Sequence, residues 1–64
     1  MVNGIVKWFN SRKGFGFISG DDNQDYFLHI SQLPQEVNVK EGDRVNFKIL
    51  ANKKGLQAIQ IELE

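Results

Sequence analysis

Two short stretches decide the fold of this 64-residue chain: GFGFI at residues 14–18 and YFLHI at residues 26–30. Their residue types suit β-strands, and the segment GDDNQD at residues 20–25 between them is rich in turn-forming residues. The two stretches therefore predict a β-hairpin. Successive side chains of a strand point to opposite faces, so the hairpin has two distinct faces.

One face of this hairpin is mainly aliphatic and the other is aromatic. The first carries Ile18, Tyr26, Leu28 and Ile30, and the second carries Phe15, Phe17, Phe27 and His29. We expect the first face to line the interior, because an exposed patch of large apolar side chains usually marks a binding surface. Periodicity alone leaves the opposite assignment open, since phenylalanine is usually buried.

Two features favour an exposed aromatic face. The face includes the polar-tipped ring of His29, which suits a surface better than a core. Gly14 and Gly16 allow another backbone or a ligand to approach closely, and a glycine inside a strand costs stability. Flat rings beside cations are well suited to single-stranded nucleic acids, because every base offers a π-face.

Three further strands are predicted from composition and alternation. Residues 4–10 are rich in β-branched and aromatic side chains. Residues 44–50 and 58–64 alternate with period two. The side chains expected on one side of these two strands are Val45, Phe47 and Ile49 in the first and Ile59, Ile61 and Leu63 in the second. The first strand needs a bulge or a strong twist, because a flat strand cannot expose both Lys7 and Trp8.

The rest of the chain predicts turns and one irregular stretch. Residues 31–42 hold the single proline, and residues 31–33 are expected to form one short helical turn. Five strands with almost no helix predict an all-β fold in one domain, residues 1–64. A closed or nearly closed barrel is expected, since closure pairs the edge strands of so short a chain.

The charges and the cysteine content exclude several classes of protein. Eight basic and eight acidic residues cancel, which argues against binding duplex DNA through bulk electrostatics. Residues 1–18 nevertheless hold three cations and no acid, and Lys53 and Lys54 form a second basic pair; a basic face and plain solvating charges both remain possible. Without cysteine, disulfides and the usual zinc ligands are excluded. No signal or membrane-spanning pattern is found, so a cytoplasmic location is expected.

Three motifs resemble those of the cold-shock domain family. They are KWFN at residues 7–10, KGFGFI at residues 13–18 and YFLHI at residues 26–30, and the later pair Gln57 and Ala58 also fits. The resemblance covers essentially the whole chain. It implies a five-stranded antiparallel oligonucleotide-binding (OB) barrel that binds single-stranded RNA or DNA on its outer face. It also implies RNA chaperone activity, in which the protein melts weak RNA structure. This activity would support transcription and translation, including in the cold.

Carried over position by position, the resemblance implies a set of nucleic-acid-binding residues. Trp8, Phe15, Phe17, Phe27 and His29 would stack on or contact bases, with Phe9 partly beneath them. Lys7 and Lys13 would meet phosphates or base edges, and Asn10, Asp25 and Gln57 would add hydrogen bonds. Ile30 and Lys54 complete the predicted site.

The chain departs from the family pattern at two positions. The family usually has an aromatic residue where this chain has Ile30, and it usually carries a phenylalanine in the loop after the second motif. Residues 31–42 contain no aromatic residue. We therefore expect weaker binding, or a shorter site, than a typical member shows.

Other functions find less support in the sequence. The only histidine lies among aromatic residues and the paired acids lie in a turn, so no enzyme, metal or cofactor is expected. The alternative function is a small β-barrel interaction module that docks a peptide on the same aromatic face. A monomer is expected.

Overall fold

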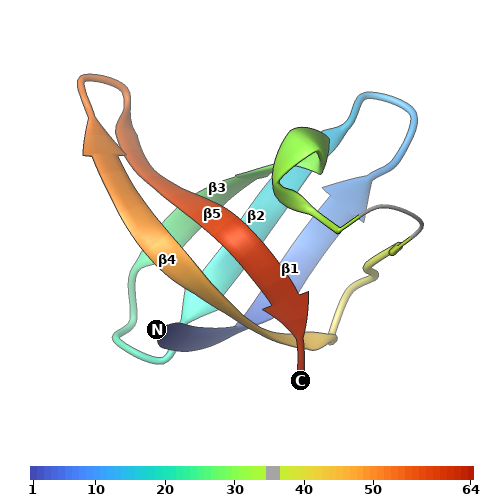
Figure 1. Cartoon of the computed structure of the whole chain (residues 1–64), viewed down its shortest axis with the longest axis horizontal. Helices are drawn as coiled ribbons and strands as arrows, with labels where there is room; N and C mark the ends of the chain where they lie inside the picture. The colour runs from blue at the N-terminus through green and yellow to red at the C-terminus, as the bar shows by residue number, and fades with distance from the viewer. Residues whose placement is uncertain (35–36) are drawn as a thin grey trace.

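The computed structural model describes residues 1–34 and 37–64; Gln35 and Glu36, in the predicted irregular stretch, lie outside the described residues. Within these described residues, five strands and one short 3-10 helix make up the fold (Figure 1). They are β1 (Val2–Asn10), β2 (Phe15–Gly20), β3 (Asp25–His29), η1 (Ile30–Gln32), β4 (Arg44–Asn52) and β5 (Gly55–Leu63). In this part of the chain, no helix has the length and hydropathy that crossing a membrane requires.

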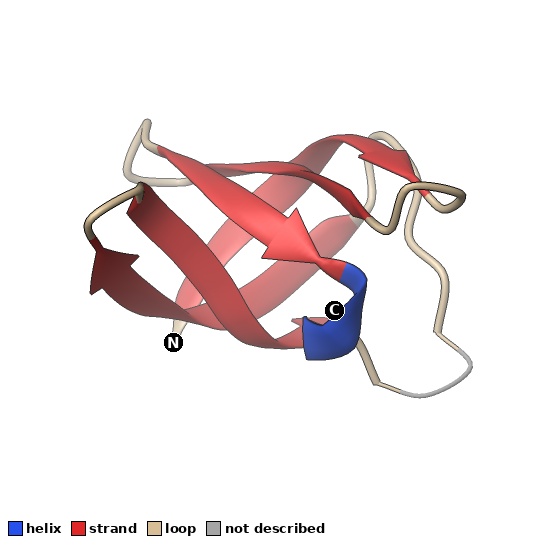
Figure 2. Cartoon of the chain, turned by 90° about the horizontal axis from the view of Figure 1, so that it is seen from above, coloured by secondary structure: helices blue, strands red, loops and turns tan. Residues whose placement is uncertain are grey.

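The five strands close into a barrel, which Figure 2 shows from above. Their order around the barrel is β1-β2-β3-β5-β4. The pairs β1–β2, β2–β3, β1–β4 and β4–β5 are antiparallel. The remaining pair, β3–β5, is parallel and joins Phe27 to Gln57 and Leu28 to Ala58. The predicted all-β barrel is confirmed, and its antiparallel pairing holds everywhere except at this closing pair.

The aliphatic face of the β2–β3 hairpin lines the core, as predicted, with one exception. Ile18, Tyr26 and Leu28 are buried, and the Tyr26 ring meets the ring of Phe47 at 5.0 Å between centroids. The prediction for Ile30 as a core residue is wrong, because its side chain is 43% exposed. Strand β3 ends at His29 and Ile30 begins η1, so the alternation stops one residue earlier than the sequence suggests.

A bulge in strand β5 changes which alternate residues face the core. Ala58 and Ile61 are both buried although they lie three residues apart, which a regular strand does not allow. Gln60 between them has a φ of 51°, and the β4–β5 register shifts opposite this point. The predicted common face of Ile59 and Ile61 is therefore wrong. The extra residue turns Ile59 to the outer side.

The β4–β5 hairpin projects beyond the closed part of the barrel (Figure 1). Val45 and Phe47 on β4 are fully buried, as the alternation predicts. Ile49 keeps the same phase, since its register partner is the buried Ala58, but 42% of it is exposed. The core thus ends before the hairpin does, and the hairpin tip is free to contact other molecules.

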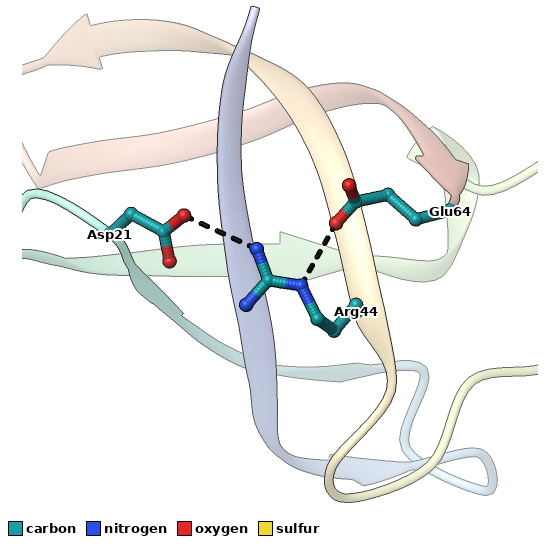
Figure 3. Close-up of polar contacts among 3 residues, drawn as sticks. All are labelled: Asp21, Arg44 and Glu64. Atoms are coloured by element: carbon teal, nitrogen blue, oxygen red, sulfur yellow. Dashed lines mark hydrogen bonds and ion pairs between the residues drawn. The ribbon is translucent and has the colours of Figure 1, made fainter.

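A three-residue ion-pair network fastens the opposite end of the barrel (Figure 3). The Arg44 guanidinium donates to Asp21 at 3.2 Å and to Glu64 at 3.1 Å. Both hydrogen bonds raise the pKa of Arg44, and the one to Asp21 has the larger effect. The network connects the start of β4 to the β2–β3 turn and to the last residue. The charges of Arg44, Asp21 and Glu64 therefore serve the structure.

Candidate functional site

Four aromatic rings from three adjacent strands form one cluster outside the core. We call Trp8 of β1, Phe15 and Phe17 of β2, and Phe27 of β3 the aromatic platform. The Trp8 ring lies 5.6 Å from both Phe15 and Phe17, centroid to centroid. Phe27 lies 6.0 Å from Phe15 and 5.8 Å from Phe17. Each ring therefore touches at least two others, and the platform is continuous.

The aromatic platform faces outward. Trp8 is 41% exposed, and the three phenylalanines are half-buried by one another while none belongs to the core cluster. The alternative assignment, with these rings as the core and the aliphatic side chains outside, is wrong. A large apolar surface of this kind on a protein of zero net charge has the character of a binding face.

A bulge in β1 brings Lys7 and Trp8 to the surface together, as predicted. The β1–β2 register shifts between Val6, which pairs with Ile18, and Trp8, which pairs with Phe17. Lys7 is the extra residue at this shift, and both it and Trp8 are exposed. The bulge thus places a cation directly beside the largest ring of the platform.

Gly16 lets β1 pass close beneath the platform. A β-carbon at this position would lie 2.2 Å from the Trp8 carbonyl oxygen and 3.0 Å from Cδ1 of Phe9. Phe9, the register partner of Gly16, is half-buried and packs against the core. It therefore supports the platform from below and offers little surface to a ligand, in the place that the family resemblance implies.

Ile30 lies at the margin of this face beside Gly14. Its backbone N–H donates to the Gly14 carbonyl at 2.9 Å, and a β-carbon on Gly14 would be 3.1 Å from Ile30 Cγ2. Gly14 has a φ of +78°, a conformation that side chains disfavour. The exposed Ile30 is thus held in a fixed place next to His29, but its aliphatic side chain adds no aromatic ring to the platform.

Three predicted polar residues already have partners within the chain. Lys7 Nζ lies 3.3 Å from Asp25 Oδ2, in an ion pair of which both side chains are about half exposed. Asn10 Oδ1 accepts the backbone N–H groups of Arg12 and Lys13 at 3.0 and 3.1 Å, so it shapes the β1–β2 turn. Lys13 itself is exposed in that turn. A ligand phosphate would compete with Asp25 for Lys7.

The His29 ring is held by Ser31, which the sequence did not point to. His29 Nδ1 accepts the backbone N–H of Ser31 at 3.1 Å and lies 2.9 Å from Ser31 Oγ. With Nδ1 accepting, the neutral ring carries its proton on Nε2, which becomes a donor. The ring centroid is 6.4 Å from that of Phe27, so this donor sits at the edge of the platform.

An open groove runs along the other edge of the platform. Its lining includes Phe17, Phe27, Gln57, Lys53 and Lys54, together with Asp25. The β4–β5 turn thus brings the second basic pair beside the rings, and the predicted residues Gln57 and Lys54 lie in the same groove as Phe27. Asn52 and Leu56 also line the groove and were not predicted. No alternation signal distinguishes them, since the hairpin tip extends past the core.

Comparison with known proteins gives a consistent result. Residues 2–63 match the family model of the 'Cold-shock' DNA-binding domain. The chain is 44% identical over 64 residues to a "Cold shock-like protein" of Thermotoga maritima, with 97% of each chain covered. It is 48% identical over 63 residues to the "Cold shock-like protein CspA" of Vibrio cholerae, covering 94% of this chain and 90% of that one. A "Major cold shock protein" of Streptococcus pyogenes is 43% identical over 63 residues, covering 95% and 94% of the two chains.

Proposed function

The chain belongs to the cold-shock domain family, and on this premise we propose that it binds unpaired RNA or DNA strands on the aromatic platform and acts as an RNA chaperone. Membership of the family makes it a nucleic-acid-binding protein and not an enzyme. The observation that carries the finer proposal is the continuous four-ring surface outside the core, with the exposed Lys7 next to Trp8 in the chain and Lys54 in the groove beside Phe27.

Stacking supplies the affinity in this proposal. A base stacked on an aromatic side chain contributes about 1 to 3 kcal/mol, so four rings supply roughly 4 to 12 kcal/mol before the costs of ordering the strand. Micromolar binding requires about 8 kcal/mol. The rings can therefore reach useful affinity although the chain has zero net charge.

The same energies limit what the protein can melt. At a free concentration of about 100 times Kd, binding favours the unpaired strand by about 2.7 kcal/mol for each site occupied. One step of a duplex is worth about 1.4 kcal/mol on average. Each bound molecule thus offsets about two steps, which is enough to open weak hairpins and too little to open long duplexes. We propose this activity for the cytoplasm, in support of transcription and translation.

The Trp8 indole provides a direct test, because bases that stack on it quench its fluorescence. We expect quenching by a thymine-rich or uracil-rich single strand and much weaker quenching by a duplex of the same sequence. A Phe15→Ala, Phe27→Ala double variant should keep the fold and lose the binding. Quenching by proline-rich peptides but by no oligonucleotide would instead favour the peptide-docking alternative, for which the aromatic groove is also suitable.

A further inference from the structure

The outer row of side chains that contains the aromatic platform does not stop at β3. Register pairs join Trp8 to Phe17, Phe17 to Phe27, Phe27 to Gln57 and Gln57 to Leu50. Register partners in a sheet project from the same side. The row therefore crosses all five strands and ends on β4 at Leu50, whose side chain is 46% exposed.

The β4–β5 hairpin also carries charge of the sign that a nucleic acid needs. Residues 47–61 contain three lysines and no acid, in a chain whose total charge is zero. Lys48 is two residues before Leu50 and shares its outer side, with Ile59 as register partner. Lys53 and Lys54 lie at the hairpin tip and line the groove beside Phe27. Asp25 is the one acid among the described residues that line this groove, and it is paired with Lys7.

From this continuity and charge we infer that the outer side of the β4–β5 hairpin is a second binding segment for single strands, in which Leu50 contacts a base and Lys48 a phosphate. This inference rests on the proposed function and extends it. A strand that covers the platform would continue over Gln57 onto Leu50. Long strands then gain contacts that short strands cannot reach.

The chain offers a matched control for this inference. Ile49 and Leu50 are adjacent, similar in size and almost equally exposed, at 42% and 46%, but they project from opposite sides of β4. Leu50→Ala should weaken binding of a thymine strand of about ten nucleotides by about fivefold, which corresponds to about 1 kcal/mol. The same variant should bind a strand of about four nucleotides like the wild type. Ile49→Ala should match the wild type at both lengths.

Salt dependence tests the role of Lys48 separately. Each phosphate contact with a single strand contributes about −0.7 to the slope of log K against log salt concentration. Lys48→Gln should make this slope shallower by about 0.7 for the long strand and leave it unchanged for the short one. Lys40→Gln, which removes a lysine outside the hairpin, should change neither slope.

The outcomes separate this inference from the proposed function. Thermal unfolding of each variant, with Leu50→Thr as a second substitution that suits a strand, establishes that the fold is kept. Equal affinity of Leu50→Ala and Ile49→Ala for the long strand would overturn the second segment, while quenching by the short strand would still support the platform. A wild type that binds long and short strands equally well would overturn it too. Failure of both strands to quench Trp8 would overturn both proposals.

Discussion

A β-carbon added to Gly16 would lie 2.2 Å from the carbonyl oxygen of Trp8, so β1 and β2 approach more closely than a side chain permits. Gly16→Ala must push the strands apart beneath the aromatic platform. We expect the free energy of unfolding to fall by at least about 2 kcal/mol, as measured by urea denaturation. Gly42→Ala is the control, since it meets only open space and brings only the strain of a φ of +93°. Equal losses in the two variants would contradict this account of Gly16.

Phe9 and Phe17 should respond to truncation in different ways. Phe9 packs against the core, whereas Phe17 belongs to the platform. Phe9→Ala should therefore lower the free energy of unfolding by about 2 to 4 kcal/mol. Phe17→Ala should cost less stability and weaken binding of a thymine strand by about 1 to 3 kcal/mol. Denaturation and Trp8 quenching on both variants check this division, which a larger stability loss in Phe17→Ala would disprove.

Replacing Ile30 by phenylalanine should strengthen binding. The side chain is exposed and lies next to His29 at the margin of the platform, at a position where the family resemblance implies a ring. An additional ring can stack one more base, which contributes about 1 kcal/mol or more to the binding free energy. Ile30→Phe should therefore lower Kd at least about fivefold. Ile30→Leu keeps the apolar size without the ring and should bind like the wild type. If both variants bind equally well, a ring at this position adds nothing.

The stability of the fold should depend on pH through Asp22 and Tyr26. The Tyr26 hydroxyl donates to the Asp22 carboxylate, which lowers the Asp22 pKa from its ordinary 3.8 and raises the Tyr26 pKa above its ordinary 10.0. The contribution of Asp22 is present above about pH 4 and is lost as the pH falls through the lowered pKa. The contribution of Tyr26 is complete below about pH 10 and is lost as the pH rises through the raised pKa.

Tyr26→Phe keeps the buried ring and removes this hydrogen bond. Its melting temperature should be below that of the wild type at neutral pH, and the gap should narrow at both pH extremes. Thermal unfolding followed by circular dichroism over a pH series measures the gap. A gap that stays constant between about pH 2 and pH 7 would show that Asp22 does not sense the tyrosine.

Binding should depend only weakly on salt. The cations near the platform include Lys7, Lys13, Lys53 and Lys54, and Lys7 must first leave Asp25. About two to four phosphate contacts predict a slope of log K against log salt between about −1.4 and −2.8. Titrations at several salt concentrations measure it. A much steeper slope would mean that charge, and not stacking, dominates the affinity.

The platform could be predicted from the sequence because its signals are local. The alternation of Phe15 and Phe17 with Gly16, and of Phe27 with Leu28, fixes which side chains share a face. A flat strand cannot expose both Lys7 and Trp8, which predicted a bulge in β1. The β1–β2 register shows this bulge between Val6 and Trp8. In each case the residues themselves carry the information about which side faces water.

The remaining features depend on contacts that the sequence pattern does not encode. Glutamine is not a residue type that marks a bulge, so the sequence does not show that β5 bulges at Gln60. The outward side of Ile59 could therefore not be predicted. Ile30 continues an apolar alternation, yet β3 ends at His29, because the His29 side chain accepts the Ser31 N–H and the Leu33 N–H donates to the Ile30 carbonyl in the turn of η1. The exposure of Ile49 follows from how far the hairpin extends past the core, which is set by the whole barrel. The parallel β3–β5 pair likewise arises only when the chain closes.

Each of the five strands is hydrogen-bonded to a neighbour on both sides, because the order β1-β2-β3-β5-β4 is a ring. A protein that displays so many phenyl groups to solvent would otherwise be in danger of polymerising, since a free strand side can template the addition of further chains. The closed order removes most such free sides, although in the described residues β4 pairs with β1 only over residues 44–47, so one side of the projecting hairpin stays open. The barrel thus allows an aromatic surface to be used for reversible capture with less hazard of amyloid than the same surface would carry on an open sheet.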